Sequence, residues 1–239
     1  MAERHGAEHG SGMGEAAVVI GASGGIGAAV TAQLRASGRF EVVHALSRGT
    51  GLDLEDEATI AAAAGRVADG PIPTLIFVAT GVLHDGLTPE RSYRSMTADH
   101  LLRDYRINAV GPALVARHFV PLFPRDRRAV FAALSARVGS IGDNRLGGWH
   151  AYRASKAALN MILRNLAVEL ARSHPQAVVA GLHPGTVQTD LSAPFQKGVP
   201  AGRLFTPDVS AARLLAVIDG LGPADSGGVF AWDGARIPE

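Results

Sequence analysis

Short apolar runs that alternate with longer helical patterns limit what this chain can fold into more than any other feature of its sequence. From residue 16 onward the apolar runs are rich in Val, Ile and Ala, which suits strands buried on both faces. The segments between them carry apolar residues at helical spacing. The pattern predicts strands at 16–20, 40–46, 52–54, 74–79, 128–134, 177–182 and 228–232, and helices at 25–37, 55–69, 97–120, 150–173 and 207–220.

This alternation predicts an α/β fold: a single-domain, Rossmann-type doubly wound parallel sheet with helices on both faces. The 239-residue chain contains no linker, so one domain is expected over residues 15–239. The Gly- and His-rich segment 1–14 has no periodicity and is predicted to be a flexible tail. Such sheets bind ligands at the carboxyl edge where the strand order reverses. The strand ends expected to face that cleft are near residues 21, 80, 135 and 183.

The charge balance excludes several classes of function. Lys and Arg number 23 against 22 Asp and Glu, so no bulk charge attracts nucleic acid or an anionic membrane. No apolar run approaches the roughly 18 residues of a membrane span. The absence of cysteine excludes disulfides and thiolate metal sites, and His5 and His9 have no further ligand nearby, so no metal site is expected. We predict a cytoplasmic protein whose function depends on a local site.

A glycine-rich turn, GASGGIG at 21–27, follows the first predicted strand and opens the first predicted helix. Gly21 permits a tight turn, Gly25 lets the backbone approach a pyrophosphate, and Gly27 lets helix and strand pack closely. The N-terminus of the helix favours an anion. The position of the turn therefore predicts a dinucleotide site that also includes Ser23 and Ile26, with a merely tight turn as the alternative.

The end of the second predicted strand bears on the choice of dinucleotide. An acidic residue about 20 positions after the glycine turn would bind the ribose 2′-hydroxyl, but the sequence there reads HALSRG. Ser47 and Arg48 instead offer a hydroxyl and a guanidinium that suit a 2′-phosphate, and Ser23 could add a hydrogen bond. The sequence favours NADP(H) over NAD(H), unless Arg48 is simply a solvated loop residue.

The stretch WHAYRASK at 149–156 places Tyr152 one helical turn before Lys156. Together with the glycine turn it makes the chain resemble the classical short-chain dehydrogenase/reductases, most closely their C-factor and Sniffer-like carbonyl reductase branch. The resemblance spans residues 16–232 and implies catalytic roles for Asn108, Tyr152 and Lys156. It also implies that Asp53 contacts the adenine amine and that Val187 and Thr189 hold the nicotinamide carboxamide. The other cofactor contacts it implies are Ala79, Gly81, Tyr152, Lys156, Pro184 and Gly185.

Two positions depart from the family pattern. The family's Asn-Asn-Ala-Gly after its fourth strand is replaced by VATG at 78–81. The family's catalytic serine is the second of a Ser-Ser pair, whereas this chain has Ser135 followed by Ala136. Ser135 is the first candidate for the missing role because it ends a strand at the cleft, and Ser140 is the second.

The chemistry of the tyrosine and lysine supports the resemblance. The ordinary pKa of tyrosine, near 10, is lowered by an ammonium within about 4–6 Å, which Lys156 could supply. Tyr152 would then protonate the alkoxide formed by hydride transfer to a carbonyl, and the family implies that Asn108 supports a water linking Lys156 to solvent. An ordinary helix pair is the structural alternative.

The sequence therefore predicts an NADP(H)-dependent oxidoreductase that interconverts a carbonyl and an alcohol on a small, fairly apolar substrate. Residues 191–205 are a candidate lid over the cleft. The family implies a homodimer or homotetramer packed through helices 97–120 and 150–173. The alternative function is a dinucleotide-binding regulatory or signalling protein, because Ala136 would fit lost catalysis and the name C-factor belongs to intercellular signalling.

Overall fold

The structure, a computed structural model, describes residues 14–84, 88–200 and 202–239. Six parallel strands form the central sheet in the order β2-β1-β3-β4-β5-β8. They are β1 (Glu15–Ile20), β2 (Val42–Leu46), β3 (Ile72–Val78), β4 (Ala129–Leu134), β5 (Ala177–His183) and β8 (Gly228–Ala231). This arrangement confirms the predicted fold class.

Within the described part of the chain, six α-helices and several short helical turns connect the strands. The α-helices are α1 (Gly25–Ala36), α2 (Glu57–Ala68), α3 (Ala98–Tyr105), α4 (Gly111–Phe119), α5 (His150–Ser173) and α6 (Pro207–Gly220). The 3-10 turns are η1 (Arg48–Thr50), η2 (Tyr93–Ser95), η4 (Val120–Leu122), η5 (Arg137–Gly139), η6 (Ala193–Phe195) and η7 (Pro223–Asp225), and η3 (Arg106–Val110) is a π-helix. A separate pair of short strands, β6 (Thr186–Val187) and β7 (Leu204–Phe205), closes the base of the loop between them.

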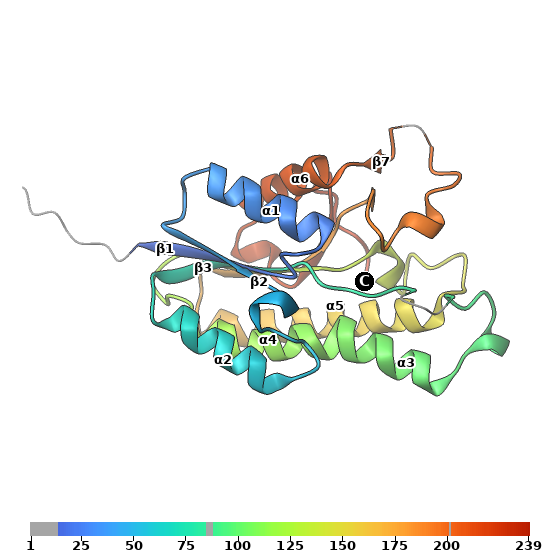
Figure 1. The fold of residues 1–239 in the computed structure, drawn as a ribbon, viewed down its shortest axis with the longest axis horizontal. Helices are drawn as coiled ribbons and strands as arrows, with labels where there is room; N and C mark the ends of the chain where they lie inside the picture. Colours follow the sequence, from blue (N-terminus) through green and yellow to red (C-terminus); the bar gives the residue numbers. More distant parts are fainter. Residues whose placement is uncertain (1–13, 85–87, 201) are drawn as a thin grey trace, which may run out of the picture.

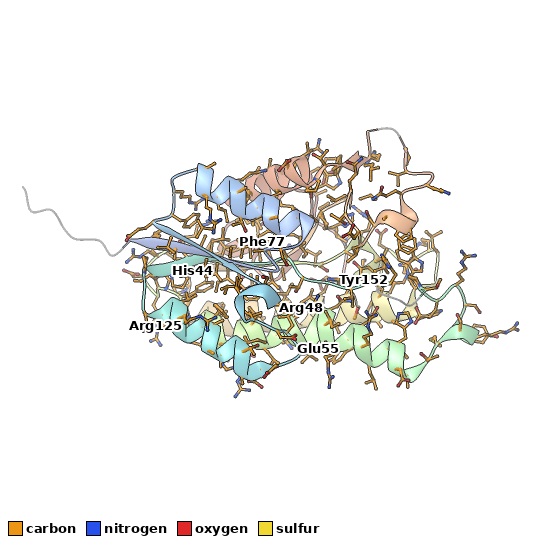
Figure 2. All side chains as sticks on the ribbon, viewed as in Figure 1. His44, Arg48, Glu55, Phe77, Arg125 and Tyr152 are labelled. Carbon is orange, nitrogen blue, oxygen red and sulfur yellow. The ribbon has the colours of Figure 1, made fainter. Side chains whose placement is uncertain are left out.

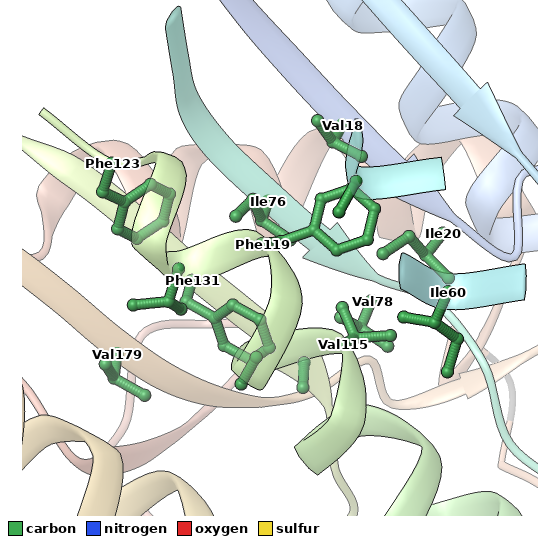
Figure 3. Packing of buried hydrophobic residues seen from close by; sticks show 14 of the residues in the cluster. Val18, Ile20, Ile60, Ile76, Val78, Val115, Phe119, Phe123, Phe131 and Val179 are labelled. Atoms are coloured by element: carbon green, nitrogen blue, oxygen red, sulfur yellow. The ribbon is translucent and has the colours of Figure 1, made fainter. Parts of the chain in front are cut away.

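The helices cover both faces of the sheet (Figure 1). Helices α1 and α6 lie on one face, whereas α2, α4 and α5 lie on the other. Figure 3 shows the packing on the face covered by α2, α4 and α5, where Ile60 of α2 and Phe119 of α4 pack over Ile76 and Phe131 of the sheet. Burying one such side chain stabilises the fold by about 1.5–3 kcal/mol. This packing therefore holds the helices against the sheet and keeps the sheet edge that carries the site in place.

Local capping residues set where several helices begin. The Asp56 side chain accepts a hydrogen bond from the Ala58 N–H at the start of α2. Thr206 accepts from the Val209 N–H at the start of α6, where Pro207 follows in the first turn. Both caps satisfy N–H groups that a helix leaves without an intrahelical partner. Helices α5 and α6 have the bounds predicted from the sequence.

Two predicted elements are absent or divided in the structure, and the bounds of most others differ from the predicted ones by one or two residues. Residues 52–54 are not a strand, because the Leu52 N–H donates to the Ser47 carbonyl and the Asp53 N–H donates to the Thr59 hydroxyl. The predicted helix 97–120 is divided into α3, η3 and α4. The predicted tail lies outside the described residues except for Gly14.

Candidate active site

The glycine turn between β1 and α1 has no room for side chains at its key positions. Gly21 has a φ of 86°, a conformation that favours glycine. A Cβ on Gly27 would lie 2.2 Å from the Gly21 carbonyl oxygen, and one on Gly25 would lie 2.8 Å from Cγ2 of Thr189. The three glycines thus permit a tight turn, a close approach of helix to strand, and contact between the turn and the segment after β5.

The first turn of α1 offers backbone N–H groups toward the carboxyl edge of the sheet. The N-cap residue is Gly24, so no side chain caps the helix, and its first turn contains no acidic residue. The first N–H groups of a helix have no intrahelical acceptor and the helix dipole favours an anion there. Together with the close-packed glycines, this N-terminus fits the pyrophosphate of a dinucleotide.

A groove of about 400 Å³ runs from this turn along the carboxyl edge of the sheet. It lies where the strand order reverses, between β1 and β3. Seven of the predicted cofactor residues line it: Gly21, Ser23, Ser47, Arg48, Asp53, Ala79 and Gly81. Figure 2 shows Arg48 and Glu55 near the loop after β2, and Tyr152 near the start of α5.

The remaining predicted cofactor residues lie around the turn and the far end of the cleft. Ile26 and Gly27 belong to the first turn of α1. Thr189 approaches Gly25, whereas Val187 is buried in the short strand β6. Gly185 follows Pro184 with a φ of 77° and packs against the rings of Phe205 and Trp232. The Arg213 guanidinium lies 4.4 Å from each of those two ring centroids and fixes the base of the loop between β6 and β7.

Asn108 joins three segments at the cleft. It is fully buried in the π-helix η3. Its amide accepts a hydrogen bond from the Val82 N–H at 2.8 Å and donates to the Val82 carbonyl at 2.9 Å. It also donates to the Ser155 hydroxyl at 3.0 Å, and that hydroxyl donates to the Tyr152 carbonyl at 2.9 Å. Asn108 therefore fixes the loop after β3 against the first turns of α5.

Tyr152 and Lys156 are both buried in the first two turns of α5. The Lys156 ammonium lies 5.8 Å from the centre of the Tyr152 ring and donates to the Leu134 carbonyl at 2.8 Å. Burial lowers the pKa of Lys156 to about 8, and burial raises the pKa of Tyr152. Among the described residues, none forms a hydrogen bond with the Tyr152 hydroxyl. The pair thus places a protonated phenol and an amine of reduced basicity at one end of the cleft.

In the segment after β4, the two serines form hydrogen bonds within the protein, whereas the alanine packs against the tyrosine. The Ser135 hydroxyl donates to Oδ1 of Asn160 at 2.6 Å, and Ser140 accepts from the Asp143 N–H at 3.1 Å. Both serines are buried. Ala136 packs with Tyr152 and Leu83 in a small apolar cluster. Of the side chains at positions 135, 136 and 140, the one in the same apolar cluster as Tyr152 is therefore the methyl group of Ala136.

Aromatic side chains complete this apolar cluster. The Trp149 ring lies 4.8 Å from the Phe195 ring and 6.3 Å, edge-on, from the Tyr152 ring. His84 lies 6.0 Å from Phe195, and its Nε2 is 3.0 Å from the Asp190 carbonyl oxygen. Phe195 belongs to the segment 191–205 that the sequence predicts as a lid, and it packs against Trp149 next to the tyrosine.

Sequence reasoning did not identify Glu90, His100, Asp104 or Ser155, all of which are buried beside the tyrosine and lysine. His100 Nδ1 lies 3.3 Å from Oε1 of Glu90, and His100 Nε2 lies 3.8 Å from Oδ1 of Asp104. The i,i+4 spacing of His100 and Asp104 was the available signal, because it puts both on one face of a helix. Ser155 lies three residues after Tyr152 on the same helix, which is a similar signal.

The parallel sheet has a glycine turn at its switch point, and a buried tyrosine and lysine lie at the same edge. These features define a dinucleotide-binding α/β oxidoreductase. A family model described as enoyl-(acyl carrier protein) reductase matches residues 6–217. The chain belongs to the short-chain dehydrogenase/reductase family, as the sequence predicted.

Individual relatives agree with this membership. The chain is 40% identical to the C-signal of Myxococcus xanthus over 139 residues, which is 58% of this chain and 78% of that protein. It is 30% identical over 223 residues to the 1-hydroxy-2-glutathionyl-2-methyl-3-butene dehydrogenase of Rhodococcus, covering 88% of this chain and 93% of that enzyme. Its fold is similar to that of an NADPH-bound carbonyl reductase from chicken fatty liver, with a TM-score of 0.78, 24% identity and coverage of 96% and 97% of the two chains.

Two features of the described residues bear on other functions. None of the helices there is long and apolar enough to cross a membrane. In the same part of the chain, no group of three or more His, Asp or Glu side chains is arranged to hold a metal ion.

Proposed function

We propose that this protein is an NADP(H)-dependent oxidoreductase that interconverts a carbonyl and an alcohol on a small, fairly apolar substrate. The observation that carries the proposal is the pair Tyr152 and Lys156, buried at the carboxyl edge of the sheet, where the glycine turn and its groove also lie. The carbonyl reductase that shares the fold is named as NADPH-bound, which agrees with this choice of cofactor.

The residues that would hold the dinucleotide follow the groove. The N-terminus of α1 with Gly21, Ser23, Gly25, Ile26 and Gly27 would bind the pyrophosphate, and Asp53 the adenine. Ala79, Gly81, Pro184, Gly185, Val187 and Thr189, with Tyr152 and Lys156, would surround the nicotinamide half. When bound, NADPH supplies a hydride to the substrate.

Tyr152 would act as the general acid. Burial raises the pKa of its phenol, so the group carries its proton throughout the neutral range. In carbonyl reduction the Tyr152 O–H donates this proton to the developing alkoxide oxygen, and in the reverse direction the phenolate accepts it. The nearby positive charge of Lys156 stabilises the phenolate that forms, while Asn108 holds the first turns of α5 in place.

The walls next to Tyr152 indicate the kind of substrate. Leu83, Ala136, Trp149 and Phe195 form one apolar cluster with Tyr152. A flat, apolar ketone, aldehyde or quinone would bury its body against them and direct its oxygen at the phenol. Ser135 would take the family serine's role only if its hydroxyl left Asn160. Its assignment as a catalytic residue stays a prediction.

Turnover of NADPH tests the proposed function against a regulatory one. We expect the purified protein to oxidise NADPH in the presence of at least one member of a panel of ketones, aldehydes and quinones. Tight NADPH binding without turnover on the panel would instead favour a dinucleotide-binding regulatory protein. The similarity to the C-signal is the reason to consider this alternative. A protein that does not bind NADPH would contradict both functions.

Arg48 is expected to determine the preference for the 2′-phosphate. It is exposed at the edge of the groove, directly after Ser47 at the end of β2. Replacing Arg48 by Ala removes the guanidinium, so the ratio of the Kd values for NADH and NADPH should fall by about tenfold or more. Arg91→Ala, which removes an exposed arginine elsewhere, is the control. An unchanged ratio in Arg48→Ala would refute the role of Arg48.

We further propose a cytoplasmic homodimer or homotetramer that packs through α3, α4 and α5. Leu102 and Tyr105 of α3 and Met161 and Val168 of α5 are large apolar side chains that are exposed in the monomer. Apolar surface of this kind is often covered by another subunit.

A further inference from the structure

Glu90, His100 and Asp104 form a chain of buried titratable groups beside the proposed catalytic pair. All three side chains are less than one-tenth exposed, and Asp104 is completely buried. Asp104 lies 3.8 Å from both His100 Nε2 and Nη1 of Arg103. Neither carboxylate oxygen of Asp104 accepts a hydrogen bond from the described residues. A buried carboxylate without hydrogen bonds is costly, so its presence calls for a reason.

Glu90 contacts the start of α5 directly, whereas Asp104 lies on α3, which packs against α5. At one end, the Glu90 carboxylate accepts the Ala151 N–H, with 3.3 Å to each oxygen, and the Glu90 carbonyl accepts the Trp149 N–H at 2.5 Å. At the other end, Asp104 lies one helical turn before Asn108, whose amide contacts Ser155. The carboxylate is thus held on the element that packs against the helix carrying Tyr152 and Lys156.

We propose that Asp104 is a positioning residue whose buried carboxylate is the counter-charge of the Lys156 ammonium, so that Lys156 stays protonated and Tyr152 stays a phenol. The proposal rests on the proposed function for its meaning, because the phenol is the form of Tyr152 that donates a proton to a carbonyl.

The electrostatics of Lys156 and Tyr152 agree with this arrangement. Burial lowers the pKa of Lys156 to about 8, and the negative charge of Asp104 opposes that shift. Burial raises the pKa of Tyr152, and the same charge raises it further. A charged Asp104 therefore disfavours loss of a proton from either group.

The charge of Asp104 itself depends on the groups around it. Burial raises the pKa of its carboxyl to about 6, and Glu90 adds to this shift. His100, Arg103 and Lys156 act in the opposite direction. Above about pH 6 the carboxylate is charged and holds the proton on Lys156, and below that pH this effect is lost. The Asp104 carboxylate is therefore charged over the pH range in which Lys156 titrates.

The composition of the chain allows a direct measurement. The sequence has only two lysines, Lys156 and Lys197. Protein labelled with ¹³C at lysine Cε should give two side-chain NMR signals, and Lys197 serves as an internal reference. We expect Asp104→Asn to lower the titration midpoint of Lys156 by about one pH unit, while Lys197 does not move. Asp104→Glu, which keeps the charge, should restore most of the wild-type midpoint.

Controls separate this role from a merely structural one. Asp99→Asn removes an exposed carboxylate from the same helix and should leave the Lys156 midpoint unchanged. If Asp104→Asn does not fold, the wild-type protein provides the test, because coupled groups titrate together. The Lys156 signal should then show a second, smaller step near pH 6 that Lys197 lacks.

An unshifted Lys156 midpoint in folded Asp104→Asn would overturn the proposal, as would the absence of that step where only the wild type can be studied. These titrations need no turnover. A wild-type protein that is inactive on the carbonyl panel would therefore refute the proposed function, and the Lys156 midpoint would still decide the role of Asp104.

Discussion

Replacing Tyr152 by Phe is expected to lower kcat/KM for NADPH-dependent carbonyl reduction by about 10²–10⁴-fold, the usual contribution of a general acid. The substitution removes the hydroxyl and retains the ring that packs with Leu83 and Ala136. Because none of the described residues forms a hydrogen bond with that hydroxyl, the thermal midpoint should change little. The measurements are steady-state kinetics on the best substrate of the panel, NADPH binding and a thermal melt.

Tyr105→Phe is the matched control for this prediction. Tyr105 is at the end of α3 and 45% exposed, so removing its hydroxyl should leave kcat/KM near the wild-type value. A Tyr152→Phe enzyme with wild-type kcat/KM would show that another group protonates the alkoxide. A large fall in its thermal midpoint would instead point to a structural role.

The fold was predictable because its strongest signals are local. Helix α5 begins at His150 and ends at Ser173, as the apolar spacing predicts. Helix α6 begins after Thr206 because the threonine caps it and Pro207 suits its first turn. The incorrect strand at 52–54 had only three residues of alternating pattern. Its backbone N–H groups donate to the Ser47 carbonyl before the loop and to the Thr59 hydroxyl in the first turn of α2, and the pattern could not reveal these acceptors.

The division of the helix at 97–120 depends on contacts between distant segments. Two of the three hydrogen bonds of the Asn108 amide go to Val82, 26 residues earlier, and the helix at this point widens into a π-helix. Such widening is frequent at functional sites. The local sequence indicates a helix throughout the region, so the π-helix becomes evident only when the loop after β3 is in place.

The candidate site was predictable to a similar extent. The glycine turn, Asn108, Tyr152 and Lys156 are recognisable from residue type and order. The burial of Asp104 is not, because an aspartate at a helix position reads as a solvated residue until α3 packs against α5. The direction of the Ser135 hydroxyl is equally hidden, since it follows from Asn160 on α5.

Replacing Gly27 by Ala is expected to destabilise the protein and to weaken NADPH binding. The new Cβ would lie 2.2 Å from the Gly21 carbonyl oxygen and 2.9 Å from its carbonyl carbon. Both atoms are backbone and cannot rotate away, so α1 must move from the turn at a cost of about 1–3 kcal/mol. The displacement takes the helix N-terminus from its place at the switch point. The Kd for NADPH should therefore rise at least tenfold, which corresponds to about 1.4 kcal/mol.

Gly65→Ala makes the same chemical change at a position where the stability of the protein is expected to rise instead of fall. Gly65 lies on the exposed side of α2, and a Cβ there would have no atom within 4 Å. A glycine in the middle of a helix costs about 0.5–1 kcal/mol relative to alanine, so this variant should melt at a higher temperature and bind NADPH normally. Thermal melts and fluorescence titrations of both variants make the comparison. A Gly27→Ala variant that melts at or above the wild-type temperature and binds NADPH normally would show that the close packing of Gly27 against Gly21 does not hold the turn in shape.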